Sequence, residues 1–133
     1  MKNELREAAA RARLRGYAPY SHFLVGAALQ LESGSIVSGC NVENISFGLT
    51  MCAERVCVGK AIEQGEKTFG ALAIVADTDT PIVPCGACRQ VLAEFAPELV
   101  ITSWTVKGES QEFSLAELLP FAKQGILEVP RGT

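Results

Sequence analysis

The pattern of apolar and polar residues at the start of the chain predicts a helix followed by two strands. Residues 2–15 are rich in Ala, Arg, Leu and Glu, which favours a helix, and Gly16 together with Pro19 ends it. The run FLVGAALQL, residues 23–31, is almost continuously apolar and predicts a strand buried on both faces. A turn at Ser33-Gly34 then leads into a second strand over residues 35–42, so the two strands form a hairpin.

Beyond this hairpin, helical and strand patterns alternate to the end of the chain. Helices are expected over residues 52–64 and from near Cys85 to about Phe95, and residues 115–119 are expected to start a final helix. Strands are expected over residues 70–76 and 99–106, with a short fifth one at 112–114. Loops cover residues 44–50 and the segment after Ala76. This order predicts an α/β fold, a three-layer α/β/α sandwich with a mixed sheet of about five strands.

Length and charge narrow the classes of function. The chain has 133 residues with 48% apolar residues, which suits one domain over residues 1–133. A formal net charge of -3 gives no electrostatic attraction for a polyanion, so nucleic acid is not expected as a partner. The first residues, MKNELREAAARARLRG, lack the apolar segment of a secretory signal, and no apolar run is long enough for a membrane span. The sequence therefore favours a cytoplasmic protein with no membrane partner.

Five cysteines, an odd number, argue against a disulfide framework in a chain without an export signal. Clustered cysteines in a reducing compartment bind metal or do redox work. Cys52, Cys85 and Cys88 all fall at predicted helix starts, where the partial positive charge of the helix favours the thiolate. Three thiolates and one open position describe a catalytic zinc site, in which the open position holds a water that zinc makes nucleophilic.

Two charged residues follow Cys52 on the same predicted turn. Glu54 could reach the water at the metal, take its proton and pass it to a substrate nitrogen. Arg55 could donate to the thiolates and offset their negative charge, or serve a subunit contact. The pattern Cys52-Ala-Glu followed by Pro84-Cys-Gly-Ala-Cys matches the signature of zinc deaminases, with Cys in place of His.

Other interpretations of these residues stay open. Cys85 and Cys88 could form a redox pair, although this leaves Glu54 without a role. The zinc site could instead be structural, with Cys40, Cys57 or His22 as a fourth ligand. Cys57 and Cys40 are expected to pack in the core instead, and a lone histidine such as His22 is usually not a ligand.

The chain as a whole resembles the short-chain cytidine deaminases. The resemblance includes YAPYSHF at residues 17–23, GCNVEN at 39–44, CAER at 52–55, PCGACRQ at 84–90 and ELLP at 117–120. It implies the same sandwich fold, one zinc per chain, and a homotetramer whose active sites are completed by neighbouring subunits.

The same resemblance implies roles in substrate binding. Asn41 and Glu43 would hold the ribose 3′-hydroxyl, and two positions apart on a strand they would point to one side. Phe23 would line the base pocket, unless it is an ordinary core aromatic. The implied substrate contacts also include Ala53 and Phe47, the latter at a position where the family usually has Tyr, in a loop that reaches a neighbouring site. Phe121 is the nearest counterpart of the aromatic that the family stacks on a neighbour's base.

The expected reaction is hydrolytic deamination of cytidine and deoxycytidine to uridine and deoxyuridine, as in pyrimidine salvage. One rival is a zinc deaminase of another small molecule, such as a modified nucleoside or a nucleoside antibiotic. A second rival is a structural zinc module that binds a partner.

Overall fold

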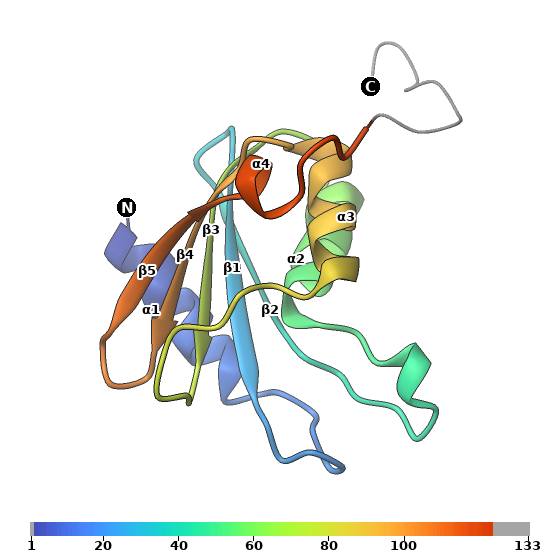
Figure 1. Ribbon diagram of the computed structural model, residues 1–133, viewed down its shortest axis with the longest axis vertical. Helices are drawn as coiled ribbons and strands as arrows, with labels where there is room; N and C mark the ends of the chain where they lie inside the picture. Colours follow the sequence, from blue (N-terminus) through green and yellow to red (C-terminus); the bar gives the residue numbers. More distant parts are fainter. Residues whose placement is uncertain (1, 124–133) are drawn as a thin grey trace.

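A five-stranded mixed sheet, in the order β2-β1-β3-β4-β5, forms the middle of the molecule (Figure 1). The structure is a computed structural model and describes residues 2–123. The strands are β1 (Val25–Leu31), β2 (Ile36–Cys40), β3 (Phe69–Ala76), β4 (Val100–Thr105) and β5 (Ser110–Ser114). The helices are α1 (Lys2–Arg13), α2 (Ala53–Glu63), α3 (Gly86–Phe95), α4 (Leu115–Leu118) and a short 3₁₀ helix, η1 (Phe47–Leu49). Among these five strands, β3 and β4 pair in parallel and the other neighbours are antiparallel.

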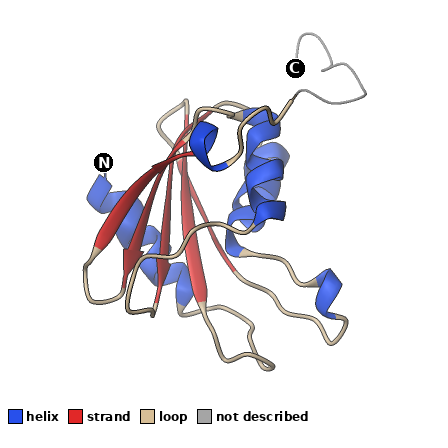
Figure 2. Ribbon diagram, in the orientation of Figure 1, coloured by secondary structure: helices blue, strands red, loops and turns tan. Residues whose placement is uncertain are grey.

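Helices cover both faces of the sheet, which confirms the predicted three-layer α/β/α sandwich (Figure 2). On one face, α1 packs Leu5 and Ala9 against Ala28, Ala73 and Val75 of the central strands. The larger core lies on the other face, between the sheet and helices α2 and α3. The central strands are therefore buried on both sides, as the continuous apolar runs predicted.

Two glycines in the hairpin let the helices approach the sheet closely. A Cβ atom on Gly26 would lie 1.9 Å from the carbonyl oxygen of Ala9 in α1. A Cβ atom on Gly39 would lie 2.7 Å from the carbonyl oxygen of Ala53, the first residue of α2. Because these neighbours are backbone atoms, any larger residue would push the helix away. Gly39 thus fixes the distance between β2 and the start of α2.

The strand directions bring the starts of α2 and α3 to one edge of the sheet, here the edge formed by the ends of the strands and not by an outermost strand. Strands β2 and β3 are both antiparallel to β1, so they run in the same direction and end at the same edge. Each is followed by a helix that returns across the sheet, and the two helices contact each other. Strand β1 begins at this edge, where Val25 pairs with Ala76. Residues before β1, after β2 and at both helix starts therefore meet here, as Figure 1 shows.

The element boundaries differ from the predictions at several points. Strand β1 begins at Val25 instead of Phe23, because its partner β3 ends at Ala76. Strand β2 ends at Cys40, so Asn41 and Glu43 lie beyond the strand. The loop after them contains η1, which was not predicted, and the fifth strand is longer than expected. Within residues 2–123, no helix combines the length and apolar character that a membrane crossing requires.

Candidate active site at the sheet edge

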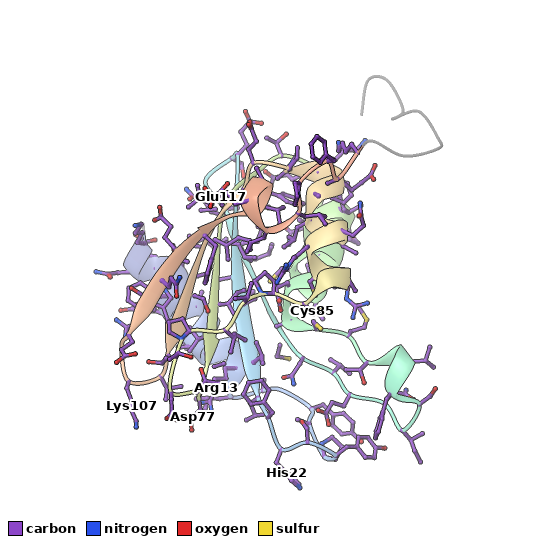
Figure 3. All side chains as sticks on the ribbon, in the orientation of Figure 1. Arg13, His22, Asp77, Cys85, Lys107 and Glu117 are labelled. Atoms are coloured by element: carbon purple, nitrogen blue, oxygen red, sulfur yellow. The ribbon has the colours of Figure 1, made fainter. Side chains whose placement is uncertain are left out.

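Three thiols from the two helix starts form one cluster. Cys52 is the N-cap of α2, Cys85 is the N-cap of α3, and Cys88 lies in the first turn of α3. Figure 3 labels Cys85 at this end of α3. The three Sγ atoms lie within 4.8 Å of one another, and those of Cys52 and Cys85 are 3.8 Å apart. Tetrahedral zinc with Zn–S bonds of about 2.3 Å places its sulfur ligands about 3.8 Å apart. The cluster therefore has the spacing that a zinc ion requires.

The cluster is biased toward a thiolate at Cys52. A hydrogen bond from Cys88, helped by Arg55, lowers the pKa of Cys52 to about 5. The same hydrogen bond, together with burial, raises the pKa of Cys88. The guanidinium of Arg55 lies 3.7 Å from Cys52 Sγ through Nη2, which also donates to the carbonyl oxygen of Thr50 at 3.1 Å. Arg55 thus stands against the thiolate whose charge it was predicted to offset.

Glu54 is a carboxyl group in the first turn of α2, beside the thiols. It is 4% exposed although it carries an ionisable group. Burial raises the pKa of Glu54 to about 7. A carboxyl with a pKa near neutrality can both accept and return a proton at physiological pH. A divalent cation at the thiols would favour its ionised form.

Arg89 forms hydrogen bonds on both sides of the start of α3, and the sequence pattern predicted no role for it. Its Nε donates to the carbonyl oxygen of Pro84 at 2.8 Å, and its Nη1 donates to that of Leu118 at 3.1 Å. It thereby connects the segment that carries Cys85 to the end of α4. No local pattern links Arg89 to Leu118, which is 29 positions away, so only the folded chain reveals this contact.

Asn41 and Glu43 both turn toward the loop that precedes β1. Asn41 is buried, accepts a hydrogen bond from Val25 N at 3.0 Å and donates one to Phe23 O at 2.7 Å. The Glu43 carboxylate accepts hydrogen bonds from the backbone N–H groups of Tyr20 and Ser21, at 3.0 and 3.2 Å, and from the Ser21 hydroxyl. The hydroxyl bond is the main reason that the pKa of Glu43 is lowered. Both residues therefore form hydrogen bonds with the same loop, the one that precedes β1, although they do not lie on a strand themselves.

The predicted aromatic contacts lie on the surface. Phe23 is 38% exposed, which rules out an ordinary core position, and Phe47 is 75% exposed. The ring of Phe47 packs edge-on against Tyr20 with centroids 6.0 Å apart. Ala53, in contrast, is fully buried. Phe121 is 76% exposed and follows α4.

The alternative metal ligands lie outside the thiol cluster. Cys57 is fully buried in the core, and burial raises its pKa to about 12, which confirms its predicted packing role. Cys40 is partly exposed and does not belong to the cluster. His22 lies at the tip of the loop before β1, well away from Cys85 in Figure 3. No fourth His, Cys, Asp or Glu joins the three thiols among residues 2–123, which leaves one position of a tetrahedral ion for another ligand.

Comparison with known proteins shows that this chain is similar to many others in sequence and in structure. The model of a family described as the cytidine and deoxycytidylate deaminase zinc-binding region matches residues 1–103. The cytidine deaminase of Sporosarcina psychrophila is 48% identical over 119 residues, covering 87% of this chain and 88% of the relative. A blasticidin-S deaminase of Bacillus cereus is 30% identical over 104 residues, covering 72% and 74%. The crystal structure of a cytidine deaminase from Burkholderia pseudomallei superimposes with a TM-score of 0.88 at 45% identity, covering 91% of this chain and 98% of that one.

Proposed function

The chain belongs to the zinc-dependent cytidine deaminases, and from this premise we propose which of its residues carry the hydrolysis of cytidine and deoxycytidine to uridine and deoxyuridine. Cys52, Cys85 and Cys88 hold the metal, and Glu54 moves the protons. The observation that carries this proposal is the three-thiol cluster beside a buried carboxyl group whose pKa is raised to about 7.

The reaction requires a nucleophile at C4 of the base and two proton transfers. Zinc, when bound, supplies a nucleophile by lowering the pKa of its water. Glu54 accepts the first proton of the attacking water and delivers it to ring N3. It then carries the second proton, from the new hydroxyl group, to the departing amine, so that ammonia leaves and the C4 carbonyl forms. Arg55 and the two helix starts offset the negative charge of three thiolates.

Asn41 and Glu43 can bind one sugar hydroxyl between them. A carboxylate offers about four acceptor positions, and three donors already occupy those of Glu43. The Asn41 amide has two N–H donors, and Phe23 O takes one of them. What remains is one acceptor and one donor, which is the complement of a single hydroxyl group. This count supports recognition of one ribose hydroxyl, which we propose is the 3′-hydroxyl. The pair then has no hydrogen-bonding group left for the 2′-hydroxyl.

The direct test is loss of the ultraviolet absorbance of cytidine on incubation with the zinc-loaded protein. We expect about one zinc per chain and rapid turnover. Cys85→Ala should lose most of the zinc because it removes one of three ligands. Cys40→Ala removes a thiol outside the cluster and should keep both zinc and activity. Metal analysis of the three proteins, alongside the absorbance assay, measures both effects.

Unchanged zinc in Cys85→Ala would contradict the ligand assignment. A wild-type protein that binds zinc but leaves cytidine intact would favour a structural zinc module. The sequence relation to a blasticidin-S deaminase favours one further candidate, a nucleoside antibiotic as substrate, so such a compound belongs in the same assay. Turnover of the antibiotic without turnover of cytidine would establish that alternative.

We also propose a homotetramer with shared active sites, supported by a set of exposed apolar residues around the loops of the sheet edge. This apolar loop patch consists of Tyr17, Tyr20, Phe23, Val42, Ile45, Phe47, Leu49 and Met51. Exposed apolar side chains gathered on two neighbouring loops indicate a protein contact surface. Phe47 and Phe121, both largely exposed, are the candidates for reaching a neighbour's site.

Phe47→Asp should dissociate the tetramer, because it places a charge in the middle of a contact surface that must be desolvated. Leu14→Asp is the matched control, since Leu14 is 71% exposed and lies outside the apolar loop patch. Sedimentation velocity at micromolar concentration measures the assembly. A tetramer that persists in Phe47→Asp, or a monomeric wild-type protein, would contradict the proposed interface.

The remaining proposals follow from the same features. A single catalytic domain over residues 1–133 agrees with the one sheet that the described residues share. A cytoplasmic location agrees with five cysteines that are free in the structure. A role in pyrimidine salvage follows from the proposed substrates, and nucleic acid is not proposed as a partner.

A further inference from the structure

The Ser21 hydroxyl occupies a central place in the contacts between the two loops of the site. It donates to Oε2 of Glu43 and accepts a hydrogen bond from the backbone N–H of Phe23 at 3.0 Å. One side-chain oxygen therefore touches both the proposed sugar-binding carboxylate and the backbone of the proposed base-pocket residue. Neither the zinc cluster nor Glu54 takes part in these contacts.

The loop that carries Ser21 and Phe23 needs such a restraint. His22, between them, has a φ angle of 59°, in the left-handed region that residues other than glycine rarely adopt. Its N–H donates to the carbonyl oxygen of Ala18 at 2.9 Å, which closes a turn. Residues in this region persist where surrounding contacts over-determine the backbone. The contacts to Glu43 and Asn41 supply that constraint on both sides of His22.

The Ser21 contact also determines which acceptor position of the Glu43 carboxylate has no hydrogen-bond donor. Oε1 receives the N–H groups of Tyr20 and Ser21, and Oε2 receives the hydroxyl. Without the hydroxyl, the carboxylate would be held by Oε1 alone and could rotate about its terminal bond. Its free acceptor position would then no longer be fixed in direction relative to the Asn41 amide.

From this geometry we propose that Ser21 is a positioning residue for substrate specificity. Its hydroxyl orients the Glu43 carboxylate toward the sugar hydroxyl. This inference rests on the proposed function, because it assumes that Glu43 binds the sugar. It goes further because it makes the preference for substrates with a 3′-hydroxyl depend on Ser21, which acts through Glu43.

The test compares Ser21→Ala, Ser21→Thr and Ser33→Ala with cytidine and with 3′-deoxycytidine as substrates. Ser33 is the matched control, because its hydroxyl also accepts from the N–H two residues later, at 3.3 Å from Ser35, but within residues 2–123 it makes no hydrogen bond to a carboxylate. Ser21→Ala should lower kcat/KM for cytidine by on the order of tenfold, mostly through KM, since a hydrogen bond to a charged group is lost. The kcat/KM for 3′-deoxycytidine should stay nearly unchanged, because that substrate lacks the hydroxyl that Glu43 is proposed to bind.

Ser21→Thr keeps the hydroxyl and should restore the wild-type preference, while Ser33→Ala should not alter it. Equal losses on both substrates in Ser21→Ala, or no loss at all, would overturn the positioning role. Glu43→Ala, measured in parallel, separates this failure from that of the proposed function. If Glu43→Ala loses the preference for the 3′-hydroxyl and Ser21→Ala retains it, only the inference about Ser21 is wrong. If Glu43→Ala also retains it, the sugar-binding role falls and this inference with it.

Discussion

Replacing Glu54 by alanine is expected to reduce kcat for cytidine by about 10⁴-fold or more while the zinc stays bound. General acid–base catalysis by one group is worth on the order of 10²–10⁴ in rate. Glu54 is proposed to serve two successive proton transfers, so its removal should reach or exceed the upper value. The metal ligands are untouched, because the thiols come from Cys52, Cys85 and Cys88.

The substitution should not unfold the protein. Without the metal, burial opposes the ionised form of Glu54 and raises its pKa from 4.5 to about 7, so a neutral side chain at this position removes a cost that begins above about pH 4.5 and is complete above about pH 7. Glu54→Gln keeps the size of the side chain and should be nearly as inactive as Glu54→Ala. Glu63→Ala, an exposed acid at the other end of α2, serves as the control and should retain full activity. A Glu54→Ala protein with a tenth of the wild-type rate would contradict the proposed role.

Free cytosine should be a substrate about 10⁴-fold poorer than cytidine, measured as kcat/KM. A site built to hydrogen-bond a substrate hydroxyl rejects an analogue without it by roughly this factor, because the polar groups of the site are left unpaired. Here those groups are the remaining donor of Asn41 and the remaining acceptor of Glu43. Deoxycytidine should react nearly as well as cytidine, since the pair has capacity for one hydroxyl only.

The comparison of cytidine, deoxycytidine and cytosine in the wild type and in Glu43→Ala measures this discrimination. Glu43→Ala should narrow the gap between cytidine and cytosine, whereas Glu32→Ala, an exposed acid in the hairpin turn, should leave it unchanged. Comparable efficiency on cytosine and cytidine in the wild type would contradict sugar recognition altogether. A full gap in Glu43→Ala would assign the recognition to other residues.

The parts of the fold that depend on apolar runs could be predicted from the sequence. Strands β1 and β3 are continuous apolar segments because both of their faces are buried, whereas a face in contact with water would place polar residues at every second position. Strand β5 was predicted too short because its sequence SQEFS is mostly polar and the strand lies at an edge of the sheet. The 3₁₀ helix η1 has only three residues and offers no periodicity to detect.

The metal cluster could be predicted for a different reason. Two of its ligands, Cys85 and Cys88, share a helix turn, and Cys52, although it lies 33 positions before Cys85, belongs to the same short sequence signature of zinc deaminases. The contacts of Ser21 with Glu43 and of Arg89 with Leu118 could not be predicted in this way. Each joins segments more than 20 positions apart, and a carboxylate that accepts from backbone N–H groups leaves no pattern in the sequence. The sheet topology brings the loops that carry Ser21 and Glu43 together where β1 begins and β2 ends.

The meeting of two helix starts and two loops at one end of the sheet divides the site into two parts that are held by different interactions. The reactive groups Cys52, Glu54 and Cys88 are attached to helices that pack against the main core. The groups proposed to read the substrate lie on the loops before β1 and after β2, which are held mainly by hydrogen bonds. Loop substitutions can therefore alter which compound is accepted without disturbing the reaction itself. For anyone seeking to retarget this enzyme, the positions to diversify are those of residues 17–24 and 41–51 that lie outside the apolar loop patch, while the two helix starts are best left intact.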